Sequence, residues 1–273
     1  MSEAVQAGWN GNKRFLRLPD GRRLAYIDSG AAGPAVLLLH GYTDSSRSWS
    51  LIAPHLDSCR LIVPDLSGHG LSDASTVPSL EGFCEDLILL ADALGLGRFG
   101  VAGHSMGAMT ALKLAALTGE RVTAVASLSG SLRPSLSAHA DLARDIRALR
   151  DPVDPESAFL ADWHQCSHPV EPAFARAIAV EAAGMPAAVW QALFAMLDET
   201  DLTETAASVH APVLLVAGDE DALFDAGHRA AMRQAFPQAE MHLLAGHSHN
   251  PHWETPALVA GILLPFLMRH AAG

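Results

Sequence analysis

The pentapeptide Gly103-His104-Ser105-Met106-Gly107 joins a short apolar run to a longer amphipathic stretch. A serine flanked by glycines at such a junction is typical of a strand that turns sharply into a helix. The glycines give this turn room, because a Cβ at either position would collide with a neighbouring strand or helix. The serine hydroxyl then projects above the sheet, next to the positive end of the helix. We therefore predict that Ser105 is a nucleophile held on a strand–turn–helix.

Short apolar runs recur along the chain on both sides of this turn. Each is continuous rather than alternating, as in strands buried on both faces of a parallel sheet. The predicted strands are Ala35–His40, Leu61–Val63, Phe99–Ala102, Val122–Leu128, Val213–Ala217 and Ala239–Leu244. Two earlier runs, Phe15–Leu18 and Leu24–Asp28, flank the turn sequence Pro19-Asp20-Gly21. This hairpin signal predicts that the sheet begins with antiparallel strands.

Amphipathic stretches alternate with the predicted strands. The predicted helices are Ser48–Leu56, Ser79–Leu94, Met106–Leu117 and a last one from Pro256 to about His270. Ser79 is suited to cap the second of these, and Gly95 to end it. Thr255 is suited to cap the last, with Pro256 at its first position. Alternation of this kind predicts an α/β fold, with a mostly parallel sheet of the eight-stranded type covered by helices on both faces.

The segment 132–207 interrupts this alternation. It carries prolines between alanine-rich helical stretches and contains no convincing strand. We predict an all-helical cap inserted into a core domain that is formed by residues 1–131 and 208–273. The aromatic residues Trp163, Trp190 and Phe194 of the cap either line an apolar pocket above Ser105 or pack the cap onto the core.

Composition argues against several classes of function. Of the 273 residues, 18 are Lys or Arg and 30 are acidic, and the net charge of −12 repels nucleic-acid phosphates. The three cysteines are far apart and lack metal-ligand spacing, so we expect neither a zinc site nor a disulfide. No run approaches the ~20 apolar residues of a membrane-spanning helix, and the N-terminus lacks an apolar signal segment. We therefore expect a cytoplasmic protein with no nucleic-acid or membrane partner.

Further motifs resemble those of the α/β-hydrolase fold superfamily, in its esterase- and lactonase-like branch. They are His40-Gly41, Asp65-Leu-Ser-Gly-His-Gly-Leu-Ser72, Gly218-Asp-Glu-Asp221 and a late histidine loop. The resemblance extends from about Phe15 to His270. It implies that the serine is activated by a histidine base, which an acid orients, in the chain order serine, acid, histidine. Because the fold hosts many chemistries, these motifs specify the fold better than the substrate.

The resemblance also selects the acid. Asp219, Glu220 and Asp221 follow the predicted strand Val213–Ala217. The family pattern resembles Gly-x-x-Asp, which favours Asp221 as the acid and leaves Asp219 as the alternative. The other carboxylates of this turn are expected to lie at a solvated loop edge.

The base is chosen from three histidines in the stretch Ala245–His252. The spacing of the following prolines in the family favours His249. His247 stays the alternative, because Ser248 stands where the family has glycine. His252 lies near the start of the last helical stretch and is expected to pack there or to line the rim of the pocket. Histidines on a loop without fixed helical spacing are poor evidence for a metal site, so we expect no bound metal.

Acyl transfer also needs hydrogen-bond donors for the oxyanion. The resemblance implies the backbone amide of Met106, directly after the nucleophile, and an amide from the loop after the strand Ala35–His40. Tyr42 is our candidate for the second donor. The residues expected to contact substrate are Trp163, Trp190, Phe194 and His252.

These residues favour a serine hydrolase that needs no cofactor and cleaves a small-molecule carboxylic ester or lactone through an acyl-enzyme. A carbon–carbon bond hydrolase or a perhydrolase with the same triad is the first alternative. A ligand receptor with a slow or vestigial triad is the second. Dehalogenases and epoxide hydrolases resembling this fold carry a carboxylate at the turn, so Ser105 argues against both. The sequence leaves the oligomeric state undetermined.

Overall fold

The computed structural model describes residues 3–271, and its centre is a sheet of eight strands. The strands are β1 (Arg14–Arg17), β2 (Arg23–Asp28), β3 (Ala35–Leu39), β4 (Arg60–Pro64), β5 (Phe99–His104), β6 (Val122–Leu128), β7 (Val213–Gly218) and β8 (Glu240–Leu244). They lie in the order β1-β2-β4-β3-β5-β6-β7-β8. The pairs β1–β2 and β2–β4 are antiparallel and the others are parallel. The predicted antiparallel start and parallel remainder are both confirmed.

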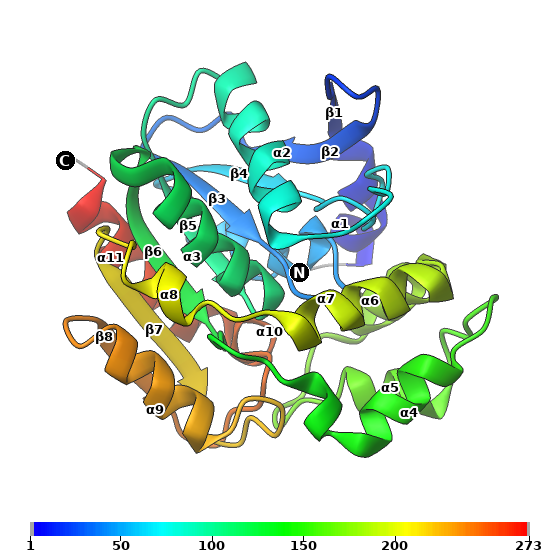
Figure 1. Ribbon diagram of the computed structural model, residues 1–273. Helices are drawn as coiled ribbons and strands as arrows, with labels where there is room; N and C mark the ends of the chain where they lie inside the picture. Colours follow the sequence, from blue (N-terminus) through cyan, green and yellow to red (C-terminus); the bar gives the residue numbers. More distant parts are fainter. Residues whose placement is uncertain (1–2, 272–273) are drawn as a thin grey trace.

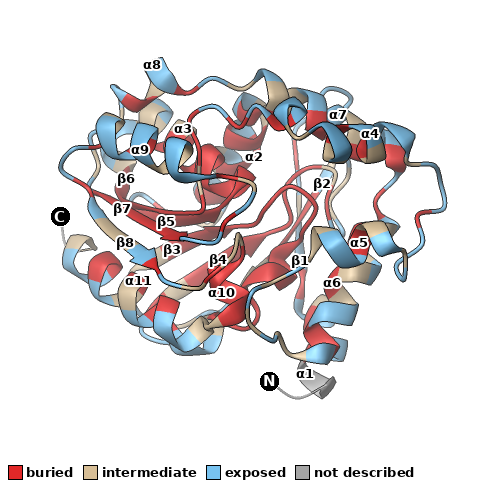
Figure 2. Cartoon of the chain, turned by 90° about the horizontal axis from the view of Figure 1, so that it is seen from below, coloured by how far each residue is buried: buried red, intermediate tan, exposed pale blue. Residues whose placement is uncertain are grey.

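The central strands are buried on both faces (Figure 2). Along β3, Leu37 and Leu39 pack into one apolar cluster, and Val36 and Leu38 into another on the opposite face. Neighbouring parallel strands divide their side chains in the same way, because successive residues of a strand point to opposite faces. This is why the sequence shows continuous rather than alternating apolar runs.

Helices cover both faces of the sheet (Figure 1). One face carries α2 (Leu80–Ala93), α3 (Met106–Thr118) and α9 (Ala226–Ala235), and the other carries α11 (Pro256–His270) and the 3₁₀ turns η2 (Ser46–Trp49) and η3 (Ala53–His55). Ser79 caps α2 as predicted, because its hydroxyl accepts the Gly82 amide at 3.0 Å. Gly95 ends that helix with a φ of +67°.

One of the local predictions about helices was wrong, and another was confirmed in position only. The predicted helix Ser48–Leu56 is only the two short turns η2 and η3. Pro54 explains this, since it has no amide hydrogen and disfavours helical backbone at the residue before it. Thr255 precedes α11 as expected but makes no capping hydrogen bond. Its hydroxyl bonds to Nε2 of His247 instead, at 2.8 Å.

The chain between β6 and β7 contains helices and no strand, as the sequence predicted. These helices are η5 (Leu136–Ala138), α4 (Ala140–Ala148), α5 (Ala158–Trp163), α6 (Pro172–Gly184), α7 (Ala187–Glu199) and α8 (Thr203–Ala206). Glu181 of α6 fastens this insertion to the core, because it accepts hydrogen bonds from Ser45 and Arg47 at 2.6 and 2.8 Å. Figure 1 shows α4 to α7 beyond the end of the sheet toward which the β7 arrow points.

Short elements complete the fold. They are α1 (Glu3–Gly8), η1 (Trp9–Asn12), η4 (Gly119–Arg121) and α10 (Pro251–Glu254). The sequence did not predict α1, which packs against α6. Within residues 3–271, no single helix combines the length and the apolar character needed to cross a membrane. Only α6 and α7 taken together pass that test, and they meet at an angle of 93°.

Candidate active site

Ser105 lies in a strained turn between β5 and α3. Its backbone φ and ψ are 53° and −116°, a combination that side chains with a Cβ rarely adopt. A Cβ on Gly103 would lie 2.1 Å from the carbonyl oxygen of Gly107, and one on Gly107 would lie 2.2 Å from that of Leu39. The Ser105 side chain makes no capping hydrogen bond to α3. Its hydroxyl is therefore not used to hold the helix.

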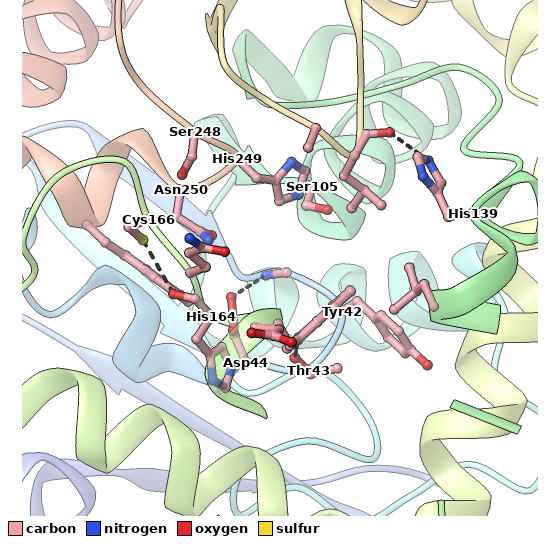
Figure 3. A pocket seen from close by; sticks show the side chains of 18 of the residues that line it. Tyr42, Thr43, Asp44, Ser105, His139, His164, Cys166, Ser248, His249 and Asn250 are labelled. Carbon is pink, nitrogen blue, oxygen red and sulfur yellow. Dashed lines mark hydrogen bonds between the residues drawn. The ribbon is translucent and has the colours of Figure 1, made fainter. Parts of the chain in front are cut away.

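His249 and Asp221 form a hydrogen-bonded pair beside this turn. His249 Nδ1 lies 2.8 Å from Asp221 Oδ2, and Figure 3 shows the imidazole next to the Ser105 side chain. The other oxygen of Asp221 accepts the amides of Leu223 and Phe224, both at 2.9 Å. Burial works to raise the pKa of Asp221, but His249 and these two amides together bring that pKa below its ordinary value. The carboxylate is thus held as an anion against the imidazole.

The alternative acid and base have other partners. Asp219 accepts the Gly246 amide at 2.7 Å, which shapes the turn before the histidines. His247 Nδ1 lies 2.9 Å from the Ala245 carbonyl oxygen, and His247 Nε2 accepts a hydrogen bond from the Thr255 hydroxyl. The pair of His249 and Asp221 is therefore the acid–base arrangement that the geometry offers.

The loop that carries His249 fits closely against the sheet. A Cβ on Gly218 would lie 2.0 Å from the His247 carbonyl oxygen, so only glycine lets this loop approach the end of β7. The His249 carbonyl accepts a hydrogen bond from Nε2 of His104, at 2.9 Å. Burial lowers the pKa of His104 to about 3, so this imidazole is a neutral donor. Gly218 and His104 both belong to motifs visible in the sequence, but their role in positioning this loop becomes apparent only in the fold.

The loop after β3 is held in shape by two buried histidines. His69 Nε2 donates to the Tyr42 carbonyl at 2.6 Å, and His40 Nε2 accepts the Leu66 amide at 2.9 Å. Within residues 3–271, the amides of Tyr42 and Met106 donate no hydrogen bond to another protein group. Both candidate oxyanion donors are therefore unused by the fold.

A cavity of about 580 Å³ opens above Ser105 and His249. Its walls come from the loop after β3, the loops that follow β7 and β8, and the helical insertion. Five acidic residues line it, and no lysine or arginine does in the part of the chain that the structure describes. These acidic residues are Asp44, Asp141, Asp145, Asp162 and Glu220.

The predicted substrate contacts divide into two groups. Trp163 lines the cavity, and its Nε1 donates to the Thr43 hydroxyl at 2.7 Å. Trp190, Phe194 and His252 do not line it. The first two are buried in the apolar core between the cap and the sheet, and His252 is fully buried against Trp49. Aromatic character alone does not reveal whether a residue faces a cavity or the core, so the sequence could not distinguish these positions.

The sequence profile of the alpha/beta hydrolase fold family matches residues 34–256. The chain belongs to this family. It is 28% identical over 286 residues to a Bacillus subtilis (strain 168) protein described as a 2-succinyl-6-hydroxy-2,4-cyclohexadiene-1-carboxylate synthase. That alignment covers 92% of this chain and 97% of the relative.

Two further comparisons show the range of activities among similar proteins. Bifunctional epoxide hydrolase 2 of Sus scrofa is 35% identical over 126 residues, which are 44% of this chain and about a fifth (22%) of that relative. The structure of a thermophilic esterase from Thermogutta terrifontis superposes with a TM-score of 0.77 at 25% identity, over 94% of this chain and 99% of the esterase.

Asp44 is a carboxyl group of this hydrolase that sequence analysis missed. It stands two residues after Tyr42 and is 6% exposed. Its Oδ2 accepts the Ser48 hydroxyl at 3.0 Å and the Gly41 amide at 3.3 Å, so it fastens the candidate oxyanion loop. Burial raises the pKa of Asp44 from 3.8 to about 6. No sequence motif marks this residue, because its burial depends on the folded loop.

We predict that Asp44→Asn removes a pH-dependent cost of folding. A carboxyl with a raised pKa binds protons more tightly in the folded chain, so its contribution to stability falls as the pH rises from about 4 to about 6. The free energy of unfolding of the variant, relative to that of the wild type, should rise by up to about 3 kcal/mol between about pH 4 and about pH 7.5. This follows from about 1.36 kcal/mol for each unit of the pKa shift. Urea unfolding of both proteins measures this gain. If the variant and the wild type differed in free energy of unfolding by the same amount at both pH values, the raised pKa of Asp44 would be contradicted.

Proposed function

We propose that this α/β hydrolase cleaves carboxylic esters or lactones of small molecules by transferring the acyl group to Ser105. The observation that carries the proposal is the hydrogen-bonded pair of His249 and Asp221 beside a strained serine, at the floor of a cavity. This is the arrangement that nucleophilic catalysis by a serine requires. The similarity to a thermophilic esterase supports the choice of substrate.

In the proposed mechanism, the Ser105 hydroxyl oxygen attacks the substrate carbonyl while its proton passes to His249. Asp221 orients the imidazole and stabilises its charged form. The amides of Tyr42 and Met106 bind the oxyanion of the tetrahedral intermediate. His249 then returns the proton to the departing alkoxide, and the ester C–O bond breaks. Water, deprotonated by the same histidine, hydrolyses the acyl-enzyme and restores the serine hydroxyl.

The residue type at the nucleophile position, a serine, argues against epoxide opening, despite the similarity to an epoxide hydrolase. The sequence places a serine at the turn, where the resemblance implies a carboxylate for that chemistry. A serine has no carboxylate oxygen to form the ester intermediate from an epoxide. We therefore propose acyl transfer for this chain.

The direct test is hydrolysis of 4-nitrophenyl esters with acyl chains from acetyl to lauroyl. We expect turnover above the spontaneous rate, with a maximum at an acyl length that fits the 580 Å³ cavity. The optimum identifies the size of the acyl group accepted. Absence of turnover for the whole series and for simple lactones would overturn the proposal and favour carbon–carbon bond substrates or a binding role.

The charge of the cavity predicts a preference for uncharged acyl chains. Arg144 pairs with two of its five acidic residues, Asp141 and Asp145, and the other three have no lysine or arginine in the lining. We expect kcat/KM for mono(4-nitrophenyl) adipate to be about tenfold lower than for 4-nitrophenyl hexanoate, whose acyl chain has the same number of carbons. The kcat/KM of each ester is divided by the rate constant of its spontaneous hydrolysis before the two are compared. Added salt should bring the two corrected values closer together, because it screens the charges of the cavity. An equal or better rate for the adipate would contradict this prediction.

A further inference from the structure

A cluster of three potential metal ligands lies outside the proposed catalytic residues. His168 belongs to the segment between α5 and α6, His247 to the loop after β8, and Glu254 to the end of α10. One ligand atom from each lies within 4.8 Å of the other two. In the sequence His247 stands near His249 and His252 instead, a group in which we expected no metal site. The fold separates those three, because His249 turns to Asp221 and His252 enters the core.

Contacts within the cluster join the helical insertion to the histidine loop. His168 Nδ1 lies 3.0 Å from Glu254 Oε2, and the rings of His168 and His247 have centroids 4.6 Å apart. The other oxygen of Glu254 accepts the amides of Ser248 and Ser167 at 3.1 and 3.3 Å, as well as the Ser248 hydroxyl. The amide and hydroxyl donors to this second oxygen are all neutral.

Glu254 is a buried carboxylate with little compensating charge. Its side chain is fully buried. Among the side chains of residues 6–271, its ion-pair partner is His168, and it forms no ion pair with a lysine or arginine. A buried carboxylate is costly unless it is paired or coordinates a metal. A bound cation can supply the missing positive charge.

We propose that His168, His247 and Glu254 bind a divalent transition-metal ion of the zinc class. Two imidazoles and one carboxylate are ligands that Zn²⁺ accepts in tetrahedral sites, with a water in the fourth position. If all three ligand atoms were separated by this upper limit of 4.8 Å, the centre of their triangle would lie about 2.8 Å from each of them. Closing to the ~2.0–2.1 Å of zinc–ligand bonds therefore requires each atom to move by less than about 1 Å.

The local chemistry permits this closure. The His168 side chain is 42% exposed, so it is free to move and leaves a path from solvent. Binding requires the Thr255 hydroxyl to release His247 Nε2. The ion then supplies the counter-charge for Glu254.

A bound ion would join the cap to the loop that positions the proposed base. His168 lies in the cap, while His247 and Glu254 lie on either side of His249 in the chain. The ion would therefore tether the two parts of the chain next to His249, which is not itself a ligand. This role goes beyond the proposed esterase activity and does not depend on it.

The test is a titration of the untagged, chelator-treated protein with Co²⁺, whose visible spectrum reports its coordination. We expect one equivalent to bind with the intense bands of a four-coordinate site, and Zn²⁺ to displace it and raise Tm by several degrees. His168→Ala should weaken binding by at least about 100-fold. His55→Ala, which removes an exposed histidine of η3, is the matched control and should leave binding unchanged.

Two results would overturn the proposal. One is the absence of saturable binding at one equivalent. The other is equal affinity in the wild type, His168→Ala and Glu254→Gln, which would mean adventitious binding at other histidines. Since His168 is a partly exposed loop residue, its variant should stay folded, and circular dichroism verifies this. The readout is spectroscopic, so failure here leaves the serine mechanism untouched, and the reverse also holds.

Discussion

Ser105→Ala is expected to lower kcat/KM for 4-nitrophenyl esters by about 10⁴-fold or more. Alanine has no oxygen to form the acyl-enzyme, and the remaining oxyanion donors and binding contacts support only weak catalysis. The side chain makes no capping hydrogen bond, so the variant should keep the wild-type Tm within a few degrees. Initial rates with purified proteins and thermal unfolding measure the two quantities together.

Retention of the wild-type rate in a folded Ser105→Ala protein would mean that another group attacks the substrate. His249→Ala is the companion variant, because it removes the proposed base that takes the Ser105 proton. It should lose activity to a similar extent, because the two residues act as a unit and their effects are far from additive.

The second large effect concerns the turn itself. Gly103→Ala is expected to lower the free energy of unfolding by about 3 kcal/mol, because the added Cβ would lie 2.1 Å from the Gly107 carbonyl oxygen and 2.5 Å from the Ala108 nitrogen. Backbone atoms of a strand and a helix cannot move aside without displacing Ser105. Loss of activity should accompany the loss of stability. Urea unfolding gives the first quantity and ester hydrolysis the second.

Gly97→Ala is the control for that experiment. Gly97 is exposed, and a Cβ on it would meet nothing within 4 Å. Its variant should therefore differ from the wild type by about 0.5 kcal/mol or less. If the two glycine variants were equally stable, the close approach of β5 and α3 would not be what requires glycine at position 103.

Much of the fold could be predicted because its signals are local. The run Val122–Leu128 and the stretch Pro256–His270 have the predicted bounds, since each is delimited by its own polar and turn residues. Ser79 and Gly95 likewise act within one helical turn. The helix predicted over Ser48–Leu56 failed for an equally local reason, as Pro54 outweighed the apolar periodicity.

The candidate site could be predicted only in part. The chain order of the serine, acid and histidine, together with turn spacing, was enough to select Asp221 and His249, which the fold brings to 2.8 Å. Asp44 could not be found in this way, because no motif marks it and its burial appears only once the loop after β3 is folded. Nor could the position of Trp190, since a helix with apolar residues on several sides does not reveal which of them faces a cavity.

His247 is a further residue whose surroundings could not be predicted from the sequence. The sequence could weigh it only against its neighbours in the loop, as a base or as one of three clustered histidines. Its imidazole instead lies next to His168, which is 79 residues earlier in the chain. Contacts at that separation leave no periodic or motif signal, so the proposed metal site emerges only from the folded chain.

The central claim is that Ser105 forms a covalent bond with the substrate carbon. The most direct measurement treats the protein with diethyl 4-nitrophenyl phosphate, in which a serine oxygen displaces 4-nitrophenolate from phosphorus. We predict one equivalent of released 4-nitrophenolate and a diethylphosphoryl group on the peptide that contains Ser105, found by mass spectrometry. His249→Ala should lack this adduct. An adduct on another residue, or none in a protein that still hydrolyses esters, would contradict the account.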